Sequence, residues 1–222
     1  MPTLPEDPQV RRERRKQARP GELLAAALEI FVDKGFAATR VEDVAARAGV
    51  SKGTLFLYFS SKEELFKAVV HENLAGRFDE WNQEFESFEG HTADMVRLCM
   101  RLWWERVGAT AASGLTKLMY SEAHNFPELA AYYHHEVIEP GRRLIRRILQ
   151  RGIDRGEFTV PDIDYAVYSV IAPMIFILLN KHSLGACVAT EPPIDPIRFI
   201  QMQADVIVHG LLARPAQGKE HA

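Results

Sequence analysis

Hydrophobic residues recur at steps of three and four along almost the whole of this 222-residue chain. That spacing is the period of an α-helix, because it places apolar side chains on one face. No stretch shows the strict apolar–polar alternation that is typical of a half-buried β-strand, and no internal repeat is visible. The pattern therefore predicts an all-α fold.

The most informative stretch begins at Thr39. Thr39 and Glu42 have the spacing of a capping box, in which each side chain bonds the backbone amide of the other residue. Apolar positions follow at helical spacing up to Gly49, which ends this first short helix. Ser51 is placed to cap a second helix over residues 52–59, and one glycine-containing turn joins the two. Such a pair forms a helix-turn-helix.

The second helix of a helix-turn-helix fits the DNA major groove, which is about 12 Å wide. The next helix opens with another capping box, from Ser61 to Glu64, and Lys62 lies in its first turn. A cation is unfavourable at a helix N-terminus, so we expect this lysine to have a separate role. Binding a backbone phosphate is the role that this position favours.

The run from residue 31 to residue 65 is F-x-x-x-G-F-x-x-T-x-V-x-D-V-A-x-x-A-G-V-S-K-G-T-L-x-x-Y-F-x-S-K-E-E-L. It resembles the DNA-binding domain of the TetR family of bacterial transcriptional regulators. The resemblance implies that Thr39 and Lys62 contact phosphates. It also implies that the recognition helix contacts DNA through Ser51, Lys52, Gly53, Thr54, Phe56, Leu57 and Tyr58. Members often carry tyrosines where this chain has Phe56 and Leu57, which lack a hydroxyl and are expected to touch thymine methyl groups.

Basic residues gather near the N-terminus, although the net charge is −3. The first 62 residues hold 11 Lys and Arg against 8 Asp and Glu. A basic segment precedes the first predicted helix, which we place at about residues 20–34. The segment contains Arg11, Arg12, Arg14, Arg15, Lys16 and Arg19. It is either a solvated tail or an arm along DNA phosphates, and beside a helix-turn-helix we favour the arm.

The later hydrophobic pattern predicts a series of longer helices. They cover about residues 66–88 (with Gly76 as the weak point), 95–107, 115–124, 127–155 (kinked at Pro140), 162–183 and 195–212. The helix over 162–183 is apolar on nearly all sides, so its own chain should cover one side and a second copy the other. An arginine stripe on the helix over 127–155 is expected to be a salt-bridged surface rather than a second nucleic-acid site. It consists of Arg142, Arg143, Arg146, Arg147 and Arg151.

Beyond about residue 70 the resemblance weakens, and it implies a helical domain that binds a small molecule and dimerises. The expected layout is a basic flexible arm (1–18), a helix-turn-helix domain (19–62), a ligand-binding and dimerisation domain (63–213) and a loose tail (214–222). Apolar pockets with a few polar groups are the usual form of a small-molecule site. The candidate cavity residues are Met100, Trp103, Trp104, Met119, Tyr120, Phe126, Tyr133 and Phe176.

Other classes of protein find little support in the sequence. Metal-binding spacings are missing, and we expect no metal or cofactor. Cys99 and Cys187 are expected to be reduced and buried. We expect neither a membrane span nor a secretory leader, so the protein should be cytoplasmic.

The leading hypothesis is a homodimeric DNA-binding repressor on a near-palindromic operator, responsive to a small-molecule effector. Two alternatives stay open: an all-helical enzyme and a protein-interaction module, in each of which the helix-turn-helix is structural. In the leading hypothesis, removing the charge of Lys62 weakens binding to all DNA sequences alike. Changing Lys52 or Thr54 alters sequence preference.

Overall fold

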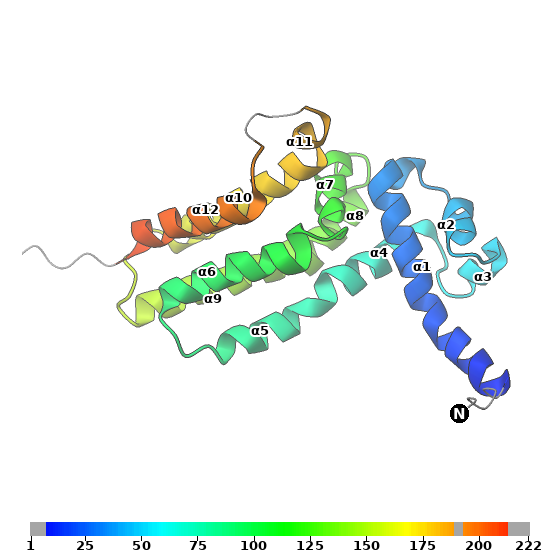
Figure 1. Ribbon diagram of the computed structural model, residues 1–222, viewed down its shortest axis with the longest axis horizontal. Coiled ribbons are helices and arrows are strands. Elements are labelled where there is room, and N and C mark those ends of the chain that lie inside the picture. Colours follow the sequence, from blue (N-terminus) through cyan, green and yellow to red (C-terminus); the bar gives the residue numbers. More distant parts are fainter. Residues whose placement is uncertain (1–7, 189–192, 213–222) are drawn as a thin grey trace, which may run out of the picture.

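The computed structural model describes residues 8–188 and 193–212 and shows them as helices joined by short turns (Figure 1). In chain order the elements are α1 (Pro8–Ala38), α2 (Val41–Arg47), α3 (Lys52–Phe56), α4 (Lys62–Asn73), η1 (Ala75–Arg77), α5 (Phe78–Glu86), α6 (Thr92–Trp103), η2 (Trp104–Gly108), α7 (Ser113–Glu122), α8 (Pro127–Tyr133), η3 (His134–Ile138), α9 (Glu139–Asp154), α10 (Ile163–His182), α11 (Leu184–Cys187) and α12 (Pro196–Leu211). Within these ranges there is no β-strand, and only Phe158 and Leu212 form an isolated bridge. The all-α prediction is confirmed.

The helices form a small head and a larger body (Figure 1). Helices α2 and α3 lie at one end of the molecule, beside the long α1. Helices α4 and α5 lead from the head along one edge of the body, and α10 and α12 run along the opposite edge. Helices α6 and α9 lie between these edges, so the body is a bundle of roughly aligned helices.

Helix α1 begins earlier than the sequence predicted, at Pro8 instead of about Pro20. Residues 8–18 of the expected flexible arm therefore have helical backbone, and Arg19 continues it. The segment is rich in arginine, lysine, glutamate and glutamine, which all have high helix propensity. Pro20 lies inside α1. The first seven residues and the predicted tail over 214–222 lie outside the described residues.

The helix predicted over residues 66–88 is divided in two. Helix α4 ends at Asn73, and a 3₁₀ turn, η1, leads into α5 at Phe78. Leu74 leaves the helical region of backbone space, with φ −133° and ψ −65°. Gly76, the predicted weak point, lies in this turn. A Cβ atom there would lie 3.0 Å from the carbonyl oxygen of His71.

The helix predicted over residues 127–155 is continuous, and it contains a π-helical turn just before Pro140, where the kink was predicted. Helix α8 passes into the π-helical turn η3, and α9 follows with Pro140 in its first turn. Proline has no N–H to donate to the carbonyl of the preceding turn, and its ring crowds that carbonyl. A π-helical turn is one of the known ways in which a helix bends.

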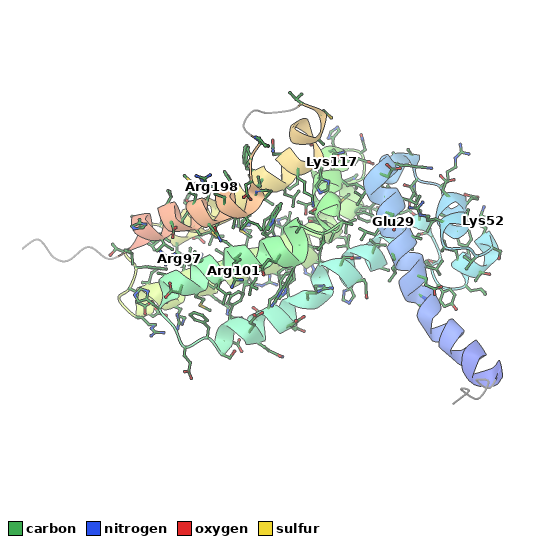
Figure 2. The ribbon with its side chains drawn as sticks, viewed as in Figure 1. Glu29, Lys52, Arg97, Arg101, Lys117 and Arg198 are labelled. Carbon is green, nitrogen blue, oxygen red and sulfur yellow. The ribbon has the colours of Figure 1, made fainter. Side chains whose placement is uncertain are left out.

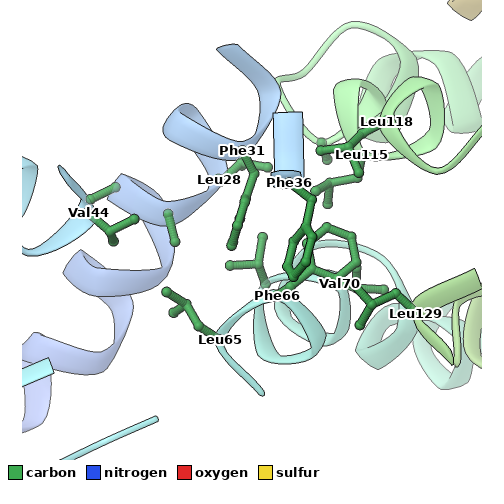
Figure 3. Packing of buried hydrophobic residues seen from close by; sticks show 14 of the residues in the cluster. Leu28, Phe31, Phe36, Val44, Leu65, Phe66, Val70, Leu115, Leu118 and Leu129 are labelled. Atoms are coloured by element: carbon green, nitrogen blue, oxygen red, sulfur yellow. The ribbon is translucent and has the colours of Figure 1, made fainter. Parts of the chain in front are cut away.

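Two hydrophobic clusters form the core, and the first joins the head to the body. It includes Phe31 and Phe36 of α1 and Phe66 of α4, whose rings lie 5.3–5.7 Å apart between centroids. Leu115 and Leu118 of α7 belong to the same cluster (Figure 3). Packing therefore continues across the predicted boundary between residues 62 and 63. The second cluster lies within the bundle of α5, α6, α9, α10 and α12.

Helix α10 buries one face and exposes the other. Val167, Val170 and Ile177 are buried against the body, whereas Tyr165 and Phe176 are 75% and 51% exposed. The neighbouring α12 likewise exposes Ile197, Met202 and Val206. Contrary to the sequence-based expectation, residues 163–187 are long and apolar enough by length and composition to cross a membrane. One face of α10 packs against α7, α9 and α12.

The arginine stripe on α9 is salt-bridged, as predicted. Arg142 and Arg143 pair with Glu139, Arg146 with Asp164, and Arg147 with Glu86. Arg151 makes no such pair among the described residues. It donates to Thr92 Oγ1 at 2.7 Å and to the carbonyl oxygens of Phe88 at 3.1 Å and Gly90 at 2.8 Å, which fixes the loop between α5 and α6 to α9.

We predict that Arg151→Met lowers the free energy of unfolding by about 2 kcal/mol, because it leaves these acceptors without their charged donor. Arg143→Met is the matched control on the same helix. Its side chain is 65% exposed and lies 3.9 Å from Glu139, so the change should stay below about 0.5 kcal/mol. Urea denaturation of both variants measures the difference. Equal stabilities would show that the loop does not depend on Arg151.

Candidate DNA-binding face and effector cavity

Helix α3, the predicted recognition helix, is a short element held by its cap and one buried side chain. Ser51 Oγ accepts from the Thr54 amide at 3.1 Å and lies 2.9 Å from the Thr54 hydroxyl, which confirms the predicted N-cap. Leu55 is fully buried against the first cluster. The helix ends at Phe56, three residues earlier than predicted, and Leu57 and Tyr58 form a turn.

The outer face of α3 consists of the residues expected to meet DNA. Leu57 is 84% exposed and Phe56 is 40% exposed, although both are large apolar side chains. Ser51, Lys52 and Gly53 are exposed as well, and Thr54 and Tyr58 are half-buried. Lys52 lies at the far end of the head (Figure 2). Exposed apolar side chains beside hydroxyls and a cation suit the edges of bases in a groove.

Lys52 also links the two helices of the motif. Its Nζ lies 2.6 Å from Glu42 of α2 and 5.7 Å from the centre of the Phe56 ring. The hydrogen bond from Lys52 lowers the pKa of the Glu42 carboxyl. Both side chains are 55% exposed, so the pair can open when a phosphate or a base competes for the lysine.

Thr39 does not form the predicted capping box. Arg40 occupies the N-cap of α2 and makes no side-chain cap bond. Thr39 is 2% exposed, and its hydroxyl donates to the carbonyl oxygen of Gly35 at 2.6 Å. The hydroxyl therefore provides a hydrogen-bond donor for a carbonyl at the point where α1 is broken. Its predicted contact with a phosphate is not available in this geometry.

Lys62 is also turned toward the protein. Its Nζ donates to the carbonyl oxygens of Phe36 at 2.8 Å, Thr39 at 3.1 Å and Ala37 at 3.4 Å. It lies 4.3 Å from the centre of the Phe36 ring. The separate role expected for this lysine is thus to neutralise the carbonyls that α1 leaves open, as a cation at a helix C-terminus does. Sequence spacing could not show this, because the acceptors lie more than 20 residues away.

Arg40 is a basic residue that the sequence-based prediction of DNA contacts did not include. It is exposed and follows the buried Thr39 directly at the start of α2. A long cation beside the recognition helix is suited to a backbone phosphate. Its position next to the presumed capping residue was the signal available in the sequence.

The body contains a cavity of about 230 Å³ with mostly apolar walls. Trp103, Tyr120 and Tyr133 line it, as predicted. The other five candidates do not: Met100, Trp104 and Met119 are buried elsewhere in the core, Phe126 stacks edge-on against Phe36, and Phe176 lies on the exposed face of α10. Aromatic residue type alone could not separate cavity wall from core, since both are apolar.

Other helices supply wall residues that no pattern in the sequence groups together. Leu74 comes from the end of α4, Phe78 and Trp81 from α5, and Tyr168 from α10. Cys99 also lines the cavity, and burial raises the pKa of its thiol to about 12. It is therefore a neutral apolar group there. Cys187 is exposed, contrary to the prediction that both cysteines are buried.

Few polar groups face the cavity. Arg106 is bound by Glu84 in a bidentate pair, with contacts at 2.6 and 3.2 Å. The Thr116 and Tyr133 oxygens lie 2.8 Å apart, and both side chains are more than nine-tenths buried. Burial raises the pKa of the Tyr133 phenol, so this group stays a neutral donor. No cluster of metal-binding side chains occurs among the described residues.

Comparison with known proteins supports the interpretation of the head as a helix-turn-helix DNA-binding region. Residues 23–69 match the bacterial regulatory proteins of the tetR family, and residues 89–186 match the tetracyclin repressor-like C-terminal domain. The chain belongs to the TetR family. A 30% identical relative, the HTH-type transcriptional repressor KstR2 of Mycobacterium tuberculosis, aligns over 76% of this chain and 83% of its own length. KstR2 of Mycolicibacterium smegmatis is 27% identical over 100% of this chain and 99% of its own.

The HTH-type transcriptional activator FasR of Mycolicibacterium smegmatis is 48% identical over 59 residues, which is only 27% of either chain. Among solved structures, the regulator FadR of Bacillus subtilis in complex with stearoyl-CoA has a TM-score of 0.68 at 16% identity, covering 86% of this chain and 98% of that one. The M. tuberculosis KstR2 structure has a TM-score of 0.67 at 18% identity, over 88% and 96%. These structures show the same fold.

This TetR-family chain is a DNA-binding transcriptional regulator. Its relatives are transcriptional regulators and are not enzymes, which removes the all-helical enzyme as an alternative.

The geometry of Lys62 gives a prediction opposite to the one from sequence. Lys62→Met should lower the free energy of unfolding by about 2 kcal/mol, because three carbonyls lose their charged donor. A residue that contacts a phosphate would instead leave stability unchanged and reduce the salt dependence of DNA binding by about one charge.

Chemical denaturation together with a salt titration of DNA binding separates the two roles. Lys67→Met is the matched control on α4. Lys67 pairs with Glu64 and lies 5.7 Å from the centre of the Tyr132 ring, and its ammonium donates to no backbone carbonyl among the described residues. If Lys62→Met has normal stability and its DNA binding depends less steeply on salt, the result would support the sequence-based prediction that Lys62 contacts a phosphate.

Proposed function

We propose that this TetR-family protein is a ligand-responsive repressor that binds a near-palindromic operator as a homodimer. The observation that carries the proposal is the pairing of two features in one chain. The recognition helix and the turn after it present Lys52, Phe56 and Leu57 outward at one end, and an apolar cavity lies in the body. One core cluster joins the two regions, so a change in one can reach the other.

The exposed face of α10 and α12 supports the homodimer. Tyr165 and Phe176 on α10 and Met202 and Val206 on α12 are large, mostly apolar side chains that are exposed on two neighbouring helices. Apolar patches of this kind on a soluble protein mark interaction surfaces. A second copy of the same face would cover them around a two-fold axis. Two-fold protein symmetry in turn demands a two-fold operator.

The operator is tested by selection from a random duplex DNA pool at moderate salt. We expect enrichment of a palindrome whose half-sites lie about one helical turn or more apart, because two recognition helices enter successive major grooves. If no sequence is enriched and binding is lost as salt rises, the protein binds DNA only by non-specific electrostatic attraction.

Two variants separate the two features that would select a palindrome, namely dimerisation through α10 and base recognition by the head. Phe176→Glu places a charge in the α10 face and should give a monomer with at least tenfold weaker binding to the full palindrome. Leu57→Ala lies at the other end of the molecule, so it should remain dimeric and change base preference within each half-site. Analytical ultracentrifugation and a repeat selection measure the two outcomes. A Phe176→Glu dimer would remove this face from the proposed interface.

The chemistry of the cavity supports an apolar effector with one hydrogen-bond acceptor. Of the two hydroxyls of Thr116 and Tyr133, only one can donate to the other. We propose that Thr116 donates to Tyr133, which leaves the hydroxyl hydrogen of Tyr133 without an acceptor among the described residues, beside the apolar cavity. A carbonyl oxygen would satisfy it. The stearoyl-CoA bound by the FadR structure carries a thioester carbonyl on a long apolar chain.

The size of the cavity limits how much of such a ligand it holds. Ligand clefts usually enclose roughly 300–1,000 Å³, and this cavity has about 230 Å³. We propose that it takes the apolar tail and the carbonyl of an acyl or keto compound, and that any large polar part stays outside.

Stearoyl-CoA is the probe for this proposal. It should weaken operator binding by the wild-type protein, measured by fluorescence anisotropy of labelled duplex. Tyr133→Phe should need at least tenfold more of it, with operator affinity unchanged, since a buried carbonyl of the ligand left without its donor costs about 1–3 kcal/mol. Tyr120→Phe is the control, because Tyr120 also lines the cavity but is 57% exposed. Equal sensitivity of all three proteins would refute the anchoring role of Tyr133.

A further inference from the structure

The turn from Phe36 to Thr39 joins α1 to α2, and the body holds it directly. Glu122, the last residue of α7, accepts from two consecutive amides of this turn. Its Oε1 lies 2.9 Å from the Phe36 nitrogen, and its Oε2 lies 3.1 Å from the Ala37 nitrogen. Lys62 donates to carbonyls of the same turn. The joint is thus held by an anion on its N–H side and by a cation on its C=O side.

The residue before this turn is a glycine for two reasons. Gly35 has φ +80°, in the left-handed region that favours glycine, and this conformation breaks α1. A Cβ atom at this position would also lie 2.5 Å from Glu122 Oε1. Any side chain there would displace the carboxylate, so the break in α1 and the contact with Glu122 depend on the same residue.

Helix α7 connects this contact to the cavity. Thr116 and Tyr120 of α7 line the cavity, and Glu122 follows Tyr120 by two residues. At its other end α7 lies tightly on α1, because a Cβ atom on Gly114 would approach Val32 Cγ1 to 2.5 Å. A displacement of α7 by a ligand is therefore passed to the end of α1 with little room for slip.

We propose that Glu122 is a positioning residue for DNA binding, which sets the orientation of the α2–α3 head and transmits the state of the cavity to it. The inference rests on the proposed ligand response. Helix α4 offers another connection, since Leu74 lines the cavity and Lys62 holds the joint. Glu122 is the direct contact, because a single side chain from a cavity-lining helix bonds the backbone of the head.

The tryptophans provide a reporter that needs no effector. The chain has three, and Trp81 and Trp103 line the cavity while Trp104 is buried beside Trp103. Coupling between two sites is reciprocal, so operator binding at the head must change the cavity if the cavity controls the head. Tryptophan emission at saturating operator therefore measures the coupling, and anisotropy of the labelled duplex verifies saturation.

The experiment compares the wild type with Glu122→Ala, Glu122→Gln and the control Glu128→Gln. Glu128 is an exposed carboxylate on α8, so its variant matches the change of charge. We expect Glu122→Ala to bind operator about tenfold more weakly and, once saturated, to lose most of the emission change of the wild type. Glu122→Gln keeps one acceptor oxygen and should lie between, and it carries the test if the alanine variant does not fold.

Hydrogen exchange provides a local readout on the same proteins. Exchange of the Phe36 and Ala37 amides should accelerate about tenfold in Glu122→Gln and stay unchanged in Glu128→Gln. A residue that only stabilises the fold would alter the melting temperature and leave the emission change at saturation intact.

Three outcomes are decisive. A Glu122→Gln protein with wild-type affinity and a full emission change would overturn the inference. So would a wild type that binds its selected operator with no change in tryptophan emission, since head and cavity would then be uncoupled. Failure of the wild type to select any sequence would instead count against the proposed function itself.

Discussion

The end of α1 is the constraint on which the rest of this structure depends. Gly35 breaks the helix, and backbone amides and carbonyls from Gly35 to Thr39 bond side chains at this helix end. An unpaired backbone group in a partly buried turn is costly. Three side chains from different parts of the chain satisfy these groups: Thr39 within the turn, Lys62 from α4 and Glu122 from α7. The helix-turn-helix is oriented by these bonds and by the packing of Phe31 and Phe36 beneath them.

This arrangement makes the head an extension of the body. A TetR-type chain is commonly divided into a DNA-binding and an effector domain, and the two matched regions here are separated by residues 70–88. The packing has no such gap, because α7 and α8 contribute to the cluster that supports α2 and α3. The long link through α4 and α5 is interrupted at Leu74, where it meets the cavity. Because the link is interrupted, a tilt of α5 reaches the head less rigidly than it would through a single helix. The contacts of α7 with α1 therefore matter more for transmitting a movement from the cavity to the head.

Local sequence patterns predicted most of the helices and their caps. They could not predict contacts between residues that are distant in the sequence. Ser51 and Ser61 cap helices as their spacing indicated, because an N-cap bond joins residues two or three apart. Lys62 was singled out correctly as a cation in an unfavourable place, but the reason lay in carbonyls 23 to 26 residues earlier. Thr39 had the spacing of a capping residue, yet the bond to Gly35 competed successfully for its hydroxyl. The cavity was the least predictable feature. Its wall combines six helices, α5 to α10, with the turns η2 and η3 and with Leu74 after α4. Residue type does not distinguish such a wall from a core.

The energies involved suit a switch. Allosteric coupling in proteins is typically 1–3 kcal/mol, and a hydrogen bond to a charged group is worth about 1.5–3 kcal/mol. Loss of one or both bonds from Glu122 would therefore change the free-energy difference between two orientations of the head by an amount of this order. The core around Phe36 and Phe66 would stay folded. A more extensive apolar interface alone could hold the head just as firmly, but dispersion contacts change little when a helix turns by a small angle. Directional bonds to two consecutive amides change steeply with the same movement. A carboxylate at the end of a cavity-lining helix is thus a more sensitive connection than packing, and the fold places it at the joint where the orientation of α2 and α3 is decided.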